Sequence, residues 1–148
     1  MTVESTSIGE LAERAGCTVQ IIRHYEKIGL LPEPRRTRGN RRIYSEDQAS
    51  RLVFIRHCRQ LGFSLDDIRQ LLSFCGQSNQ SCAQVDMIAR KHLGHVQERL
   101  ARLRSMEREL KRMINQCSGG KVAECKIIEV LADHSKCLSD DHSPMVFC

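Results

Sequence analysis

The stretch SIGELAERAGCTVQIIRHYEKIG, residues 7–29, has the pattern of two short amphipathic helices joined by a glycine-containing turn. Ser7 and Glu10 stand three residues apart, the spacing of a capping box at the start of the first helix. Gly16 is suited to end that helix, and Thr18 is suited to cap the second. The stretch therefore predicts a helix-turn-helix, although many plain helical hairpins share the pattern.

A small basic hairpin is expected after the second helix. Pro32 and Pro34 exclude a helix there, and Gly39-Asn40 is a turn signal before a short return strand. Five arginines fall close together in this hairpin: Arg35, Arg36, Arg38, Arg41 and Arg42. Such a density of positive charge is suited to binding phosphate.

Two further helices complete the N-terminal domain. Ser45 and Ser64 are suited to cap them. Their apolar residues, together with those of the first two helices, suffice for one small core. We expect this domain to cover residues 1–75, with a frayed lead-in over residues 1–6.

Residues 83–116 predict one long helix, because they contain no proline and a single glycine. Their apolar residues recur at spacings of three, four and seven: Val96, Leu100, Leu103, Leu110, Ile114 and, just beyond, Cys117. The helix is roughly 50 Å long at the standard rise. Nothing else in the chain is long enough to cover this stripe, so we expect a homodimer, antiparallel or parallel. The alternative is a helix that folds back on its own domain.

Composition excludes several classes of protein. No stretch approaches 18 uninterrupted apolar residues, and Met1–Glu10 lacks the features of a secretory signal, so we expect a cytoplasmic protein without a membrane partner. Eight cysteines in such a protein favour metal or redox chemistry over disulfides. No phosphate loop, nucleophile–base pair or carboxylate pair stands out, so no enzyme is expected.

Several motifs, in this order, resemble the MerR family of transcriptional regulators: Ile8-Gly9-Glu10-Leu11-Ala12, Ile22-Arg23-His24-Tyr25-Glu26, Gly29-Leu30-Leu31, Arg42-Ile43-Tyr44 and Leu61-Gly62-Phe63-Ser64-Leu65-Asp66-Asp67-Ile68. The resemblance implies a mainly α protein that begins with a winged helix-turn-helix DNA-binding domain, residues 1–75. A linker and long antiparallel coiled-coil dimerisation helix follow over residues 76–116. A short C-terminal metal-binding loop and helix occupy residues 117–131, and a mobile tail residues 132–148.

The resemblance also implies a function. Members of the family bind pseudo-palindromic promoter DNA as homodimers, and an effector makes the dimer distort an overlong promoter spacer so that RNA polymerase can use it. The second helix would enter the major groove. The residues expected at DNA are Thr18, Gln20, Arg23, His24, Tyr25, Arg36, Arg38, Arg42 and Tyr44. For Tyr25, a partly buried core position is an equal alternative.

Three cysteines match the metal-sensing branch of the family: Cys82, Cys117 and Cys125. Cys82 begins the long helix and Cys117 ends it, so only an antiparallel dimer brings Cys82 of one protomer to Cys117 and Cys125 of the other. Thiolates select soft or borderline ions. Members that sense monovalent copper, silver or gold have serine at the position of Cys82. We therefore expect a transcriptional activator that responds to a divalent ion, namely mercury, cadmium, lead or zinc.

Other assignments stay open. Zinc normally takes a fourth ligand, and the candidates are Cys75, His134, Cys137, His142 and Cys148, each of which is more often structural or mobile. Cys17 and Cys58 are expected to pack as inert thiols in the N-terminal domain. The alternative function is a redox-responsive regulator of the same fold, in which Cys117 and Cys125 form a disulfide. A third alternative is a metal-storage protein. The basic hairpin counts against this function, because metal storage does not require a phosphate-binding surface.

Overall fold

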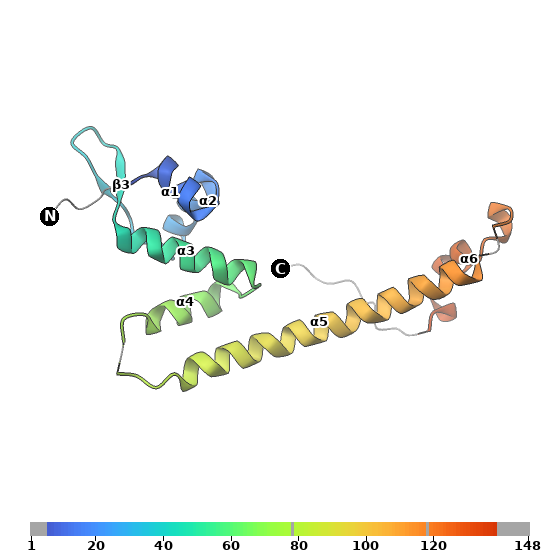
Figure 1. Cartoon of the computed structure of the whole chain (residues 1–148). Coiled ribbons are helices and arrows are strands. Elements are labelled where there is room, and N and C mark those ends of the chain that lie inside the picture. Colours follow the sequence, from blue (N-terminus) through green and yellow to red (C-terminus); the bar gives the residue numbers. More distant parts are fainter. Residues whose placement is uncertain (1–5, 78, 118, 139–148) are drawn as a thin grey trace. The chain divides into compact units, whose positions relative to one another are not determined.

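The computed structural model describes residues 6–77, 79–117 and 119–138. The chain divides into two units, Met1–Val85 and Asp86–Cys148, and each is described by itself. Figure 1 labels their helices and strands along the chain. In the described part of the chain, no helix is long and apolar enough to cross a membrane.

The first unit begins with helices α1, Ile8–Ala15, and α2, Val19–Lys27. Ser7 and Glu10 form the capping box, in which each side chain accepts a hydrogen bond from the other residue's backbone N–H. Gly16 ends α1 in the left-handed conformation, at φ 62°, which glycine adopts without strain. The predicted helix-turn-helix is therefore confirmed.

A three-stranded antiparallel sheet, in the order β1-β3-β2, lies beside these helices. Strands β2, Arg35–Arg36, and β3, Arg42–Tyr44, are the arms of the predicted basic hairpin, the wing. Strand β1, Thr6–Ser7, was not expected. The prediction of a frayed lead-in is wrong at Thr6, which pairs with Tyr44 because β3 offers its second edge to the chain entering α1.

Helices α3, Glu46–Gln60, and α4, Leu65–Phe74, complete the unit. Ser45 and Ser64 cap them, as predicted from the sequence. The largest fully buried side chains are Tyr44, Leu11, Ile22, Leu30, Leu31, Leu52, Ile55 and Ile68. They come from helices, strand and connecting turns alike, and removing their apolar surface from water is the main stabilisation of the unit.

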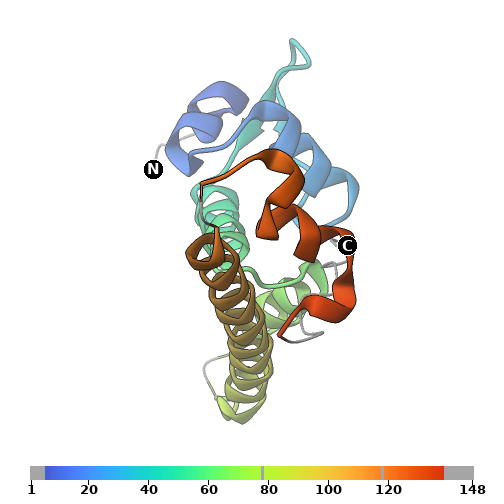
Figure 2. The same cartoon turned by 90° about the vertical axis from the view of Figure 1, so that its right-hand side faces the viewer.

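Most of helix α5, Ala83–Gln116, belongs to the second unit, and its bounds agree with the prediction. Beyond it the chain forms the 3₁₀ turn η1, Val122–Glu124, then helix α6, Lys126–Ala132, and the 3₁₀ turn η2, His134–Lys136. This segment, drawn in orange to red, lies beside the last turns of α5 (Figure 1, Figure 2), to which Lys136 and Leu138 are joined by hydrogen bonds. Among the described residues of the unit, the apolar ones that are buried are Met113 and Val130.

The mobile tail expected over residues 132–148 stays a prediction, and the structure describes this stretch only as far as residue 138. Its beginning forms η2, and hydrogen bonds join Lys136 and Leu138 to α5. Local propensity gave no sign of this, because the bonds connect residues more than twenty positions apart. Residues 139–148 lie outside the described part of the chain.

The apolar stripe of α5 is not covered within the second unit. Four leucine and isoleucine members of the predicted stripe are 44–62% accessible to solvent: Leu100, Leu103, Leu110 and Ile114. The segment that doubles back lies near Glu109 and Met113, which are buried, and one pocket is lined by these two residues, Leu110 and Val130. The predicted stripe therefore stands open in the described part of this unit.

Candidate nucleic-acid interface and metal centre

Helix α2 has one face in the core and one in solvent. Ile22 is fully buried, and Thr18 caps the helix by accepting a hydrogen bond from the Ile21 N–H. The predicted contacts on this helix that are exposed are Thr18, Gln20, Arg23 and His24. A recognition helix presents a polar face of this kind to base edges in the major groove.

The two tyrosines predicted at DNA lie deeper than the other residues of that set. Tyr25 is 5% exposed and takes the core position that was the alternative for it. Tyr44 is 1% exposed, and its hydroxyl donates a hydrogen bond to Glu26 at 2.5 Å. Burial, then the Glu26 carboxylate, raise the pKa of Tyr44 far above its ordinary value. In the chain without DNA, the Tyr44 hydroxyl is therefore held by an internal carboxylate, and its expected contact with phosphate stays a prediction.

Glu26 is a residue of the candidate interface that sequence reasoning did not single out. Its side chain is 10% exposed, accepts the Tyr44 hydroxyl and pairs with Arg42 at 3.6 Å. Because Glu26 is in α2 and its two partners are in β3, it fixes the wing relative to the recognition helix. The sequence carried one signal of this role. Glu26 is a negatively charged residue in a helix that was otherwise expected to contact phosphate, which would repel it.

The wing itself carries the basic residues at its surface. Arg36 donates to the Asn40 side chain at 2.9 Å, so the turn of the hairpin orients this guanidinium. Arg42 is half-buried beside Glu26. The remaining wing arginines are exposed: Arg35, Arg38 and Arg41. Exposed guanidinium groups on a hairpin beside a recognition helix suit contacts to the DNA backbone, which position a protein but carry no sequence information.

Two of the three predicted metal ligands come together in the second unit. Cys117 directly follows α5, and Cys125 is the residue that precedes α6. The backbone N–H groups of Ile128 and Ile127, and then the Cys117 thiol, hold the pKa of Cys125 below its ordinary value. A lowered pKa favours the thiolate, which is the form that binds metals. The backbone N–H groups and the neighbouring thiol thus favour the thiolate form of Cys125.

The third predicted ligand does not join them within one chain. Cys82 is exposed and directly precedes α5, whereas Cys117 follows it. A straight helix of 34 residues is about 50 Å long, which separates the two thiols widely. Among the described residues, no group of three or more histidine, cysteine, aspartate or glutamate side chains is arranged to hold a metal ion. A single protomer therefore supplies two neighbouring thiols and a third at a distance.

The residues left open by the sequence fall in several places. Cys75 is exposed at the end of α4, where its thiol contacts the Leu71 carbonyl oxygen. His134 and Cys137 line an apolar pocket of about 400 Å³ beside Met113 and Val130. Cys58 is buried in the core as expected, and Cys17 is half-buried; burial raises the pKa of both thiols. His142 and Cys148 lie outside the described residues.

Family models match most of the chain. The model described as "MerR HTH family regulatory protein" matches residues 6–75. The model described as "MerR, DNA binding" matches residues 49–113. Together they extend from β1 through nearly all of α5.

Comparison with individual relatives extends the similarity into the segment that follows α5. The transcriptional regulator ZntR of Escherichia coli K12 is 42% identical over 127 residues, which cover 84% of this chain and 90% of that protein. The mercuric resistance operon regulatory protein of Bacillus cereus is 36% identical over 84% of this chain and 95% of its own length. The crystal structure of PbrR691 from Ralstonia metallidurans CH34 in complex with lead(II) is similar at a TM-score of 0.72 and 41% identity, covering 85% of this chain and 98% of that one.

Proposed function

The chain belongs to the MerR family of helix-turn-helix regulatory proteins, and from that premise we propose that it is a metal-responsive transcriptional activator that works at promoter DNA as a homodimer. The effector is a divalent thiophilic ion: mercury, cadmium, lead or zinc. Its partners are double-stranded promoter DNA and the RNA polymerase that uses the promoter. A cytoplasmic location follows from these partners.

One observation carries the metal-responsive part of this proposal. Cys117 and Cys125 interact at the end of α5, and the pKa of Cys125 is held low by backbone N–H groups and the neighbouring thiol. Two adjacent thiols, one of them inclined to ionise, form the donor set that soft and borderline ions prefer. The similarity to a mercuric resistance operon regulatory protein, and to PbrR691 in complex with lead(II), supports the same interpretation.

The third ligand comes from a second copy of the chain. The open stripe of α5 is an apolar surface that another α5 can cover by coiled-coil packing. In an antiparallel pair, the start of one helix lies beside the end of the other, so Cys82 of one protomer reaches Cys117 and Cys125 of its partner. Each dimer then has two equivalent three-thiolate sites, one at each end of the coiled coil.

DNA recognition divides between α2 and the wing. Gln20, Arg23 and His24 face the major groove, while Arg36, Arg38 and Arg42 contact the backbone. Thr18 lies at the start of α2, where a hydroxyl can meet a phosphate. The bound ion supplies a bond between protomers, and the thiolates that hold it fix the loop and α6 against the partner's α5. This shifts the balance between two arrangements of the DNA-binding units, one of which distorts the promoter spacer.

The decisive test is metal binding by the reduced protein, wild type against Cys82→Ser, with mercury, cadmium, lead, zinc and monovalent copper titrated separately. Structural zinc sites contribute about 10–16 kcal/mol through four ligands, so one thiolate accounts for about 3 kcal/mol, or a loss of affinity of about 100-fold. Cys75→Ser is the matched control, and we expect it to change affinity by less than about twofold. Equal affinity of wild type and Cys82→Ser would contradict the shared site.

The same contact between Cys117 and Cys125 favours one alternative, a regulator that responds to oxidation. In that case a disulfide forms between these residues and transcription responds with no metal present. Peroxide added to the protein in the presence of a chelator separates the two functions. The metal-responsive proposal requires that this treatment leave promoter activation unchanged.

A further inference from the structure

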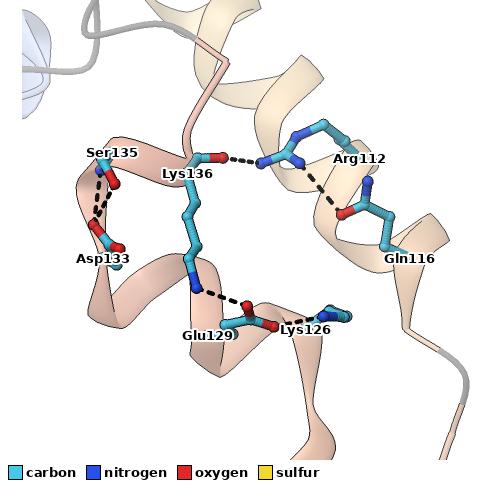
Figure 3. A network of polar contacts seen from close by, with 7 residues as sticks. All are labelled: Arg112, Gln116, Lys126, Glu129, Asp133, Ser135 and Lys136. Atoms are coloured by element: carbon cyan, nitrogen blue, oxygen red, sulfur yellow. Dashed lines mark hydrogen bonds and ion pairs between the residues drawn. The ribbon is translucent and has the colours of Figure 1, made fainter.

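Hydrogen bonds attach the chain after α6 to α5. The Arg112 guanidinium donates to the Lys136 carbonyl oxygen at 2.9 Å, and the Leu138 N–H donates to the Glu109 carboxylate at 3.1 Å. Figure 3 shows Arg112 reaching across from α5 to this segment. We call residues 133–138 the clasp. It lies beyond Cys117 and Cys125, the two ligands that this unit supplies in the proposed three-thiolate site.

Burial of Glu109 indicates that the contact between the clasp and α5 is part of the folded structure of this unit. Glu109 is 6% exposed, although most of the charged side chains of α5 are exposed. Its carboxylate pairs with Arg112 at 2.5 Å, and the Arg112 side chain is itself only 22% exposed. A buried carboxylate without partners is strongly destabilising, so the pair and the clasp N–H have to stay in place together.

The clasp is also connected to α6. Lys136 donates to the Glu129 carboxylate at 2.7 Å, and Lys126 donates to the other oxygen of the same carboxylate at 2.7 Å (Figure 3). Lys126 directly follows Cys125. These side chains are 40–57% exposed, so the two ion pairs contribute little on their own. The chain of contacts nevertheless runs from α5 through the clasp to the start of α6.

Helix α6 needs such support, because it is only seven residues long and has a single deeply buried residue, Val130. Isolated helices of this length are not stable in water. The N–H groups at its start, those of Ile127 and Ile128, are the groups that face the Cys125 thiol. Whatever fixes α6 on α5 therefore also fixes Cys125 beside Cys117.

We propose that Glu109 and Arg112, by holding the clasp on α5, are positioning residues for the metal-binding loop. They set the distance between Cys125 and Cys117 without contacting the ion. The proposal deepens the metal-responsive function proposed above and rests on it. Groups that orient metal ligands from outside the coordination shell typically account for about 10- to 100-fold in metal affinity.

The test compares cadmium binding by the reduced full-length protein with that of Glu109→Gln and Arg112→Met. The affinity is measured by competition with a chromophoric chelator, and the site is followed by the thiolate-to-cadmium absorption band. Lys111→Met is the matched control, since Lys111 neighbours Arg112 on α5 and pairs with Glu107 where both side chains are largely exposed. Circular dichroism and the affinity of the metal-free protein for DNA report whether each variant folds.

We expect cadmium affinity to fall about tenfold or more in Glu109→Gln and Arg112→Met, with an altered absorption band and unchanged DNA affinity of the metal-free protein. Arg112→Lys, which keeps the positive charge and one donor, should recover part of the loss. Lys111→Met should match wild type. Cadmium affinity and band within about twofold of wild type in both folded variants would overturn the proposal. Absence of the thiolate band in the wild type would instead overturn the metal site itself.

Discussion

The two units use the same helical spacing of apolar residues with opposite results. In the first unit, Leu11 on α1 and Ile55 on α3 are 0% exposed, because neighbouring elements of the same unit cover them. On α5, Leu103 is 50% exposed and Leu110 is 54% exposed, although their spacing is as regular. An apolar stripe therefore indicates that a helix face packs against another element. It does not indicate whether that element belongs to the same chain or to a second copy. In the first unit the apolar faces are buried by elements of the same unit. In the second unit we propose that the α5 of a second copy buries the stripe.

The largest expected effect concerns the closed core of the first unit. Ile55→Ala removes a fully buried side chain and leaves a cavity, so we expect the free energy of unfolding to fall by about 2–5 kcal/mol. Val53→Ala, on the same helix but 43% exposed, is the control and should change it by about 0.5 kcal/mol or less. Urea denaturation followed by circular dichroism measures both. Similar losses for the two variants would contradict the description of this core.

A second prediction concerns the open stripe of α5. If a second copy covers it, Leu103→Ala removes apolar contact from both protomers and should weaken dimerisation by about 2 kcal/mol, or about 30-fold in the dissociation constant. Arg108→Ala, at an exposed position away from the stripe, is the control. Sedimentation equilibrium over a range of concentrations gives the dissociation constants. A chain that stays monomeric in the wild type would show that something other than a second copy covers the stripe.

The smallest expected effect tests the tie between the recognition helix and the wing. Tyr44→Phe removes the donor to Glu26 and should cost about 1 kcal/mol of stability, with weaker DNA binding because β3 is no longer fixed to α2. Retention of wild-type stability by the variant would mean that the hydrogen bond is replaced by another.

The same tyrosine predicts a dependence on alkaline pH. The pKa of Tyr44 is raised in the folded protein, so the protonated phenol is favoured there, and its contribution to stability is complete below the ordinary tyrosine pKa of about 10. That contribution is lost as the pH rises through the folded-state pKa. Wild type should therefore lose stability above about pH 10 more steeply than Tyr44→Phe, which thermal unfolding at a series of pH values will measure. Parallel curves would contradict this assignment.

Much of the fold follows from residues close together in sequence. Ser7, Ser45 and Ser64 each cap the helix that follows them. Each side chain accepts a hydrogen bond from the backbone N–H only three residues later in the sequence. The bounds of α5 follow from the absence of proline and from the repeat of its apolar residues. For the candidate metal site, the sequence indicated which thiols to consider. The contact between Cys117 and Cys125 supports two of the three.

Contacts between residues far apart in the sequence could not be predicted from local patterns. The strand pairing of Thr6 with Tyr44 and the burial of the Tyr44 hydroxyl against Glu26 depend on residues 18 or more positions apart. Glu109 looks like one more charged residue on the solvent side of a long helix. It is nevertheless only 6% exposed, and the chain doubles back to bring the Leu138 N–H to its carboxylate.

By itself, the sequence determined the helices, their caps, the basic wing, the stripe on α5 and the cysteines available to a soft ion. These depend on hydrogen bonds and periodicity within a few residues, which the order of side chains specifies directly. Only the tertiary structure decided that Tyr44 serves the core, that Glu26 joins wing and recognition helix, and that residues 133–138 return to Glu109 and Arg112. The reason is that a buried polar group needs a partner, and which distant residue provides it depends on how the chain closes on itself.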